Sequence, residues 1–83
     1  MQTAPLYIIV IKDYFSRQEL RRRQHLNIDN ALKMAKAFVD ELLPPRMNGR
    51  NQLKELHYYN LEKNHSTLVE GKKVEIVTDF VYL

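Results

Sequence analysis

The sequence predicts an α+β fold: a ββαββ-like domain in which a mixed or antiparallel sheet of about four strands carries one main helix on one face. Three observations predict it. An apolar run follows Pro5, apolar residues recur at helical spacing in the middle of the chain, and a final stretch is rich in Val, Ile, Phe and Tyr. The 83 residues are 45% hydrophobic and 28% charged, a balance typical of globular chains. We therefore expect one small domain over residues 1–83.

The first element is a strand over residues 6–12, Leu-Tyr-Ile-Ile-Val-Ile-Lys. Apolar side chains at successive positions, many of them β-branched, are typical of a strand that is buried on both faces. The run is far shorter than the roughly 20 residues that a membrane-spanning helix needs. It also follows Pro5 and has no basic segment before it, so it does not resemble a signal peptide. We expect no membrane partner.

Residues 17–26 fit two structures. Ser16 followed by Glu19 is a capping-box pattern, which indicates a short helix. Leu20 and Leu26, however, are the strongly apolar residues here, and both fall on one face of a strand, whereas a helical stripe would be nearly empty. We favour an exposed edge strand. The helical alternative would make this segment the first helix of a DNA-binding helix-turn-helix, although no glycine turn follows it.

The helix signal is strong from Ile28 onward. Asn27 is the expected N-cap, and Pro44-Pro45 should end the helix near Leu43, because proline lacks an amide proton and restricts the residue before it. The apolar stripe repeats every three or four residues and consists of Ile28, Ala31, Leu32, Ala35, Phe38, Val39 and Leu42.

The last part of the chain is predicted to hold two further strands. Residues 46–52 are polar, contain Asn-Gly and should form a loop. Residues 53–62 are predicted as the third strand, because they carry Leu56, Leu61 and the pair Tyr58-Tyr59. After a turn and a short apolar piece at residues 67–69, residues 73–82 form a long final strand.

Both long strands are apolar on two sides. On the final strand, Val77, Val81 and Leu83 oppose the side that carries Val74, Ile76, Phe80 and Tyr82, because side chains alternate along a strand. One helix covers one side of a sheet, so the other side would keep an apolar patch that isolated domains seldom expose. We predict that Val77, Val81 and Leu83 form a sheet-face interface with a protein partner or with a second copy in a homodimer.

No pattern in the sequence indicates catalysis. The three histidines, His25, His57 and His65, lack the close spacing of metal ligands, and no cysteine is present. Gly49 and Gly71 stand alone in predicted loops, so neither a phosphate-binding loop nor a dinucleotide fingerprint is formed. We therefore expect a protein that is not an enzyme, with no metal, no cofactor and no small-molecule substrate. The absence of cysteine fits a reducing, cytoplasmic setting.

A group of arginines is the one local feature of the sequence that suggests a binding surface. Arg17 and Arg21-Arg22-Arg23 are candidates for a basic patch, joined by Arg46 and Arg50 if the fold brings their loop close. Arginine forks bind the carboxylates of a protein partner or the phosphates of a nucleic acid. On an exposed edge strand, the same charges would discourage edge-to-edge pairing without any ligand.

The sequence thus favours a non-catalytic binding or regulatory module that acts through protein–protein contact. Small accessory or inhibitor proteins of phages and mobile elements are of this size, and the link to them rests on size alone. The alternative is a nucleic-acid-binding protein that uses the arginine patch, although a net charge of +3 is a mild excess compared with dedicated nucleic-acid binders and does not decide between the two functions.

Overall fold

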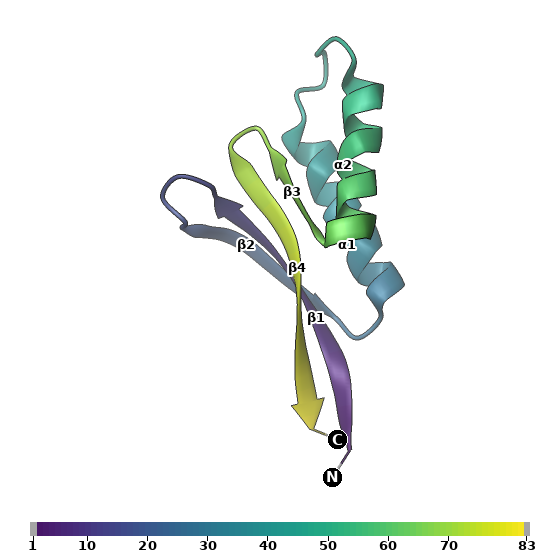
Figure 1. Ribbon diagram of the computed structural model, residues 1–83. Helices are drawn as coiled ribbons and strands as arrows, with labels where there is room; N and C mark the ends of the chain where they lie inside the picture. Colours follow the sequence, from purple (N-terminus) through teal and green to yellow (C-terminus); the bar gives the residue numbers. More distant parts are fainter. Residues whose placement is uncertain (1, 83) are drawn as a thin grey trace.

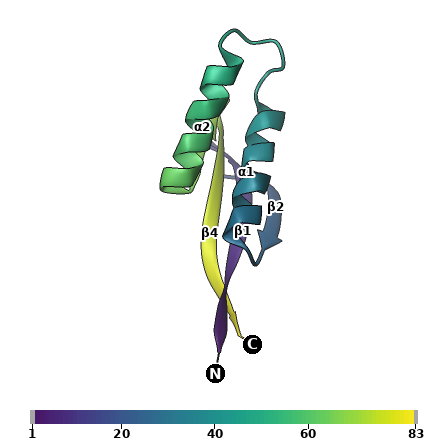
Figure 2. The ribbon, with the colours of Figure 1, turned by 90° about the vertical axis from the view of Figure 1, so that its right-hand side faces the viewer.

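The computed structural model describes residues 2–82 and has the predicted α+β architecture. The strands are β1 (Thr3–Asp13), β2 (Glu19–His25), β3 (Ser66–Val69) and β4 (Lys72–Tyr82). They form one antiparallel sheet in the order β2-β1-β4-β3. The helices are α1 (Ile28–Leu42) and α2 (Arg50–Asn64). Both helices lie on the same face of the sheet (Figures 1 and 2).

The prediction of a third strand over residues 53–62 is wrong, because this segment belongs to α2. Leu53, His57 and Leu61 are four residues apart and turn inward, where Leu61 is fully buried. The exposed Leu56 and the exposed Tyr59 lie between them and hide the helical stripe. The sheet still has four strands, because the short apolar piece at residues 67–69 pairs with β4 as β3. The domain therefore carries two helices where one was expected.

Residues 19–25 form the expected edge strand β2, which excludes the helix-turn-helix alternative. The prediction for α1 is confirmed at both ends. Asn27 caps its start, where its side-chain oxygen accepts the amides of Asp29 (2.8 Å) and Asn30 (3.2 Å). At the other end Leu43 is the C-cap, and the two prolines follow it.

The core lies between the helices and one face of the sheet. Ile9 and Ile11 of β1 and Val74 and Ile76 of β4 are buried there against α1, with Phe38 among the largest fully enclosed side chains. Alternation along each strand then directs the intervening residues to the opposite face, which we call the open face because no helix covers it. The predicted division of the two long strands into faces is confirmed for the described residues.

The sheet extends beyond the helices. Residues 3–6 of β1 pair with residues 79–82 of β4, and this two-stranded ribbon projects past the start of α1 (Figure 1). The molecule is consequently elongated, with principal dimensions of 51 × 26 × 17 Å. Phe80 and Tyr82 point to the helix side of the ribbon but are 62% and 75% exposed, because the helices do not reach them.

Candidate functional site

The open face combines an apolar zone and a charged zone, which the strand register places end to end. The apolar zone is formed by Leu6 and Ile8 of β1 with Val77 and Val81 of β4, and the exposed Asp79, opposite Leu6, lies between the two valines on the same face. Val77 is directly opposite Ile8 and is 44% exposed, whereas the other three apolar side chains are half-buried. Two of the three residues predicted as a sheet-face interface, Val77 and Val81, therefore lie together on this face. Leu83 falls outside the described residues.

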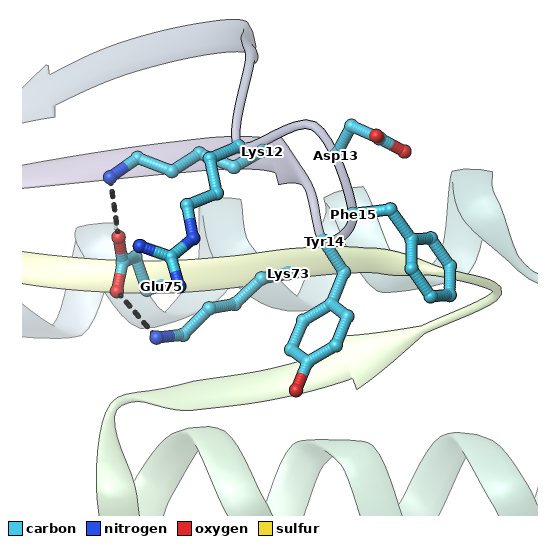
Figure 3. Close-up of a pocket in the computed structure, with 7 residues that line it drawn as sticks. Lys12, Asp13, Tyr14, Phe15, Lys73 and Glu75 are labelled. Atoms are coloured by element: carbon cyan, nitrogen blue, oxygen red, sulfur yellow. Dashed lines mark ion pairs between the residues drawn. The ribbon is translucent and has the colours of Figure 1, made fainter.

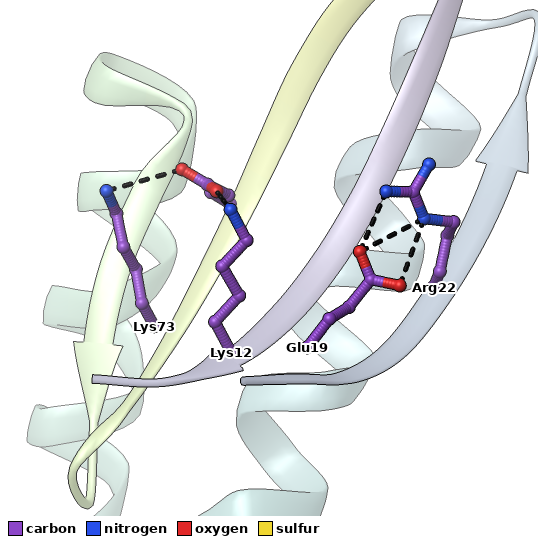
Figure 4. Close-up of polar contacts among 5 residues, drawn as sticks. Lys12, Glu19, Arg22 and Lys73 are labelled. Carbon is purple, nitrogen blue, oxygen red and sulfur yellow. Dashed lines mark hydrogen bonds and ion pairs between the residues drawn. The ribbon is translucent and has the colours of Figure 1, made fainter. Parts of the chain in front are cut away.

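The charged zone begins at the next pair on the same face, Val10 with Glu75, toward the turn between β1 and β2. Lys12 and Lys73 each form an ion pair of 3.3 Å with Glu75, which lies between them. On β2, Arg22 holds the carboxylate of Glu19 through its Nε (3.2 Å) and its Nη2 (2.7 Å). Figure 4 shows these two clusters side by side on the sheet.

Local contacts set the charge of this zone. The hydrogen bond from Arg22 lowers the pKa of the Glu19 carboxyl below its ordinary value. The same contact raises the pKa of the Arg22 guanidinium.

Val10 lies between Arg22 and Glu75 in the sheet register and is only 3% exposed, although no helix covers it. The stems of its long charged neighbours therefore enclose it, as such side chains commonly do.

A hollow of about 500 Å³ opens at the end of the charged zone, beside the turn between β1 and β2 (Figure 3). Two exposed aromatic rings of this turn, Tyr14 and Phe15, meet edge to face with their centroids 5.5 Å apart. A hydrogen bond from the Ser16 amide to the Asp13 carboxylate (2.8 Å) shapes the turn and lowers the pKa of Asp13. The lining consists of Lys12, Asp13, Tyr14, Phe15, Arg17, Lys73 and Glu75.

The fold does not bring the predicted arginines into one patch. Arg21 points to the helix side, where its Nη1 donates to Glu41 of α1 (2.6 Å) and its guanidinium lies 4.8 Å from the ring centre of Phe38. Arg23 shares that side by alternation, whereas Arg22 lies on the open face. Arg17 lines the hollow, in the turn between β1 and β2, with a positive φ of 62°.

The two arginines of the long connection between the helices have different positions. Arg50 donates through Nη2 to the carbonyl oxygen of Asp40 (2.7 Å) and through Nε to that of Pro44 (3.1 Å). These are carbonyl groups at the end of α1, so Arg50 closes the connection between the two helices. Arg46 is exposed in the same connection, outside any helix or strand. The basic patch remains a prediction from the sequence, and the geometry gives it no common surface.

His57 is the buried titratable group of the domain. Its Nδ1 lies 2.6 Å from the hydroxyl oxygen of Thr67, which also accepts a hydrogen bond from the Asn60 amide (3.4 Å). Burial lowers the pKa of His57, and the negative charge of Glu70 opposes this shift. The neutral imidazole therefore joins α2 to β3.

Among residues 2–82, no three His, Asp or Glu side chains gather closely enough to hold a metal ion. No helix in this part of the chain is long and apolar enough to cross a membrane. Sequence reasoning overlooked Lys12, Lys73 and Glu75. Alternation alone places Lys12 on the same side as Ile8, but the register of β1 with β4 was needed to put Glu75 between the two lysines.

Comparison with known proteins provides no relative from which a role could be carried over: no family model, curated protein or solved structure matches this chain.

Proposed function

We propose that this protein is a non-catalytic binding module that acts through contact between its open face and another protein. The observation that carries the proposal is that both helices pack on one side of the sheet, which leaves Val77 exposed beside Leu6, Ile8 and Val81. Apolar side chains grouped on one face and bordered by charged groups are typical of protein-binding surfaces.

The two zones define the partner's chemistry. An apolar surface on the partner would bury the apolar zone, and polar or charged groups would meet the rim formed by Lys12, Lys73 and Glu75. Because each charge of the rim already has a partner of opposite sign, the rim contributes orientation more than affinity. Most of the binding energy is then expected from the apolar zone.

The placement of the titratable groups supports a role without catalysis. His57 is buried against Thr67, whereas His25 ends β2 and His65 forms the C-cap of α2. The hollow beside the turn contains two carboxylates and three cationic side chains, and no histidine lines it. No histidine is therefore placed to act as a general base among the groups that line the hollow.

The test is a pull-down in which the tagged protein is compared with two variants. Val77→Glu places a charge in the apolar zone, and Leu56→Glu makes the same kind of change at an exposed leucine of α2. We expect the wild type and Leu56→Glu to retain one partner protein at low and high salt. Val77→Glu should bind that partner at least about tenfold more weakly, the factor in affinity that 1.4 kcal/mol of apolar contact represents. The comparison is then repeated with the purified partner.

Two results would contradict this proposal. Equal retention of the partner by Val77→Glu and by Leu56→Glu would remove the open face as the binding surface. Copurifying nucleic acid that disappears at high salt would instead favour the arginine-based alternative, since phosphate contacts weaken steeply with salt.

A further inference from the structure

We infer that a second copy of this chain pairs with the free edge of β4, so that two sheets join edge to edge around a two-fold axis. This inference rests on the proposal that the protein acts through protein contact, and it adds a specific partner and a surface separate from the open face. The free edge consists of residues 77–82 of β4, on the side where β3 pairs with the beginning of the same strand.

The direction of the backbone groups follows from one hydrogen bond. The amide of Ile76 donates to the carbonyl oxygen of His65 (2.7 Å), toward the β3 side. Successive residues of an antiparallel strand direct their N–H and C=O groups to opposite edges. Thr78, Phe80 and Tyr82 therefore present their backbone groups to the β3 side, and in the described residues β3 ends its pairing at Glu75.

The contact made by Phe80 agrees with this direction. Its amide donates to the side-chain oxygen Oδ1 of its own neighbour, Asp79, at 2.8 Å. The amides that face β1 take part in the β1–β4 ladder, so this local bond indicates a donor on the unpaired side. A second strand would replace the Asp79 oxygen with a carbonyl oxygen.

Two other edges of the sheet, those of β2 and of the projecting part of β1, carry features that hinder pairing. The β2 edge presents three consecutive arginines, Arg21 to Arg23. Pro5 is paired with Phe80 in the register of β1 with β4. Because the backbone groups of Phe80 point away from β1, those of Pro5 point away from β4, to the outer edge of the projecting ribbon. Proline has no N–H with which to bind another strand there. Residues 77–82 contain no Lys, Arg or Pro, and Asp79 is their single charge.

Charge and hydrogen bonding select one register for two antiparallel copies of β4. A pairing centred on Asp79 would place two carboxylates directly opposite each other, which is unfavourable. A pairing centred on Val81 would pair Phe80 with Tyr82 and leave Thr78 without a partner among residues 77–82. A pairing centred on Phe80 places Phe80 opposite its copy and Thr78 opposite Tyr82, and each facing pair exchanges two backbone hydrogen bonds.

This arrangement would also bury apolar surface. The two Phe80 rings, each 62% exposed in the single chain, would be neighbours on the helix side of the joined sheet. A two-fold axis perpendicular to the sheet would place both open faces on the opposite side, as one continuous surface. A partner protein of the kind proposed above would then meet an open face of doubled area.

The first experiment measures mass by light scattering for the wild type, Phe80→Ala and Phe80→Pro at tens of micromolar protein. The wild type should have twice the 9.9 kDa chain mass. Phe80→Ala keeps the amide and should remain associated, whereas Phe80→Pro removes an outward-facing amide without touching the β1–β4 ladder and should have the single-chain mass. Circular dichroism checks that both variants are folded.

The second experiment tests the register and does not depend on the proline variant. The chain has no cysteine, so every cross-link must come from an introduced thiol. With pairing centred on Phe80, Asp79 of one copy is opposite Val81 of the other, at the roughly 4.5 Å separation between Cα atoms that a disulfide can span. A mixture of Asp79→Cys and Val81→Cys should cross-link under mild oxidation at least ten times faster than either variant alone.

Several results would overturn the edge pairing. They are a wild-type mass of 9.9 kDa at every concentration, a Phe80→Pro variant that stays associated, and faster cross-linking of one cysteine variant alone. If the chain is single but Val77→Glu still loses a captured protein, the edge inference fails and the proposed function stands. If the chain pairs through β4 but Val77→Glu retains every captured protein, the edge inference stands and the proposed function fails.

Discussion

Arg50→Ala distinguishes a structural arginine from a ligand-binding one. In the structure, Arg50 donates to the carbonyl oxygens of Asp40 (2.7 Å) and Pro44 (3.1 Å) and pairs with the Asp40 carboxylate (3.1 Å). The side chain of Arg50 is 22% exposed and that of Asp40 is 51% exposed, so water screens the ion pair. We assign about 1 kcal/mol to each carbonyl bond and about 0.5 kcal/mol to the ion pair.

Water partly replaces the lost bonds after truncation, so we expect a loss of about 2 kcal/mol in the free energy of unfolding. For a domain of this size that corresponds to a decrease in Tm of roughly 8–16 °C. Arg50→Lys keeps the charge but lacks the planar fork that reaches two carbonyl groups, so it should recover less than about half of the loss. Thermal and urea unfolding followed by circular dichroism measure both values.

Arg46→Ala is the matched control, because Arg46 is exposed in the same connection. We expect its effect to stay within about 0.5 kcal/mol of the wild type. The structural role assigned to Arg50 would be refuted if Arg50→Ala and Arg46→Ala were equally stable. Arg50 would then again be a candidate for binding carboxylates or phosphates.

Two further predictions concern the core. The lowered pKa of His57 means that the unfolded chain takes up its proton at a higher pH than the folded chain. The stability that His57 contributes should therefore be full above about pH 6.5 and decrease as the pH falls through the lowered pKa of the folded state. Urea unfolding between pH 8 and pH 5 should show this decrease in the wild type and a flatter profile in His57→Gln. Phe38→Ala removes a ring that is 2% exposed and should cost about 3–5 kcal/mol. Because the whole domain is expected to have only about 4–12 kcal/mol of stability, this loss should strongly lower the urea midpoint or leave the variant largely unfolded, and a transition with the midpoint of the wild type would contradict the packing described for α1.

Elements whose signals are local could be predicted from the sequence. Asn27 and the two prolines mark the ends of α1 through backbone chemistry that acts within a few residues. The first and last strands, β1 and β4, are continuous apolar runs whose division into two faces follows from alternation. The edge strand β2 could be chosen over a helix because Leu20 and the following Leu26 did not fit a helical stripe.

Helix α2 could not be recognised because its inward-facing positions are weakly apolar. His57 occupies a core position and is satisfied by Thr67, a contact that only the tertiary structure provides. Leu56 and Tyr59 are exposed, although leucine generally favours burial and tyrosine generally favours strands. A spacing of four residues from Leu53 through His57 to Leu61 was the available signal, and the polar histidine interrupts it.

The predicted arginines do not share one surface for a different reason. Three consecutive residues of a strand cannot share a face, so Arg22 is separated from Arg21 and Arg23 once β2 is a strand. The partners of Arg21 and Arg50 come from α1, and the packing direction of that helix depends on long-range contacts that a local pattern does not contain.

The edges of the sheet give these arginines a role that needs no ligand. A strand with unpaired backbone groups is a template for another chain, and charges or proline on that strand hinder the pairing. This protein places Arg21 to Arg23 on the β2 edge and Pro5 on the β1 edge, yet residues 77–82 of β4 have no proline and Asp79 as their single charge. If uncontrolled association were the sole hazard, this more apolar segment would need protection most. Its weaker protection is expected if this edge is used, and the arginines then ensure that pairing occurs at β4 and not at β2.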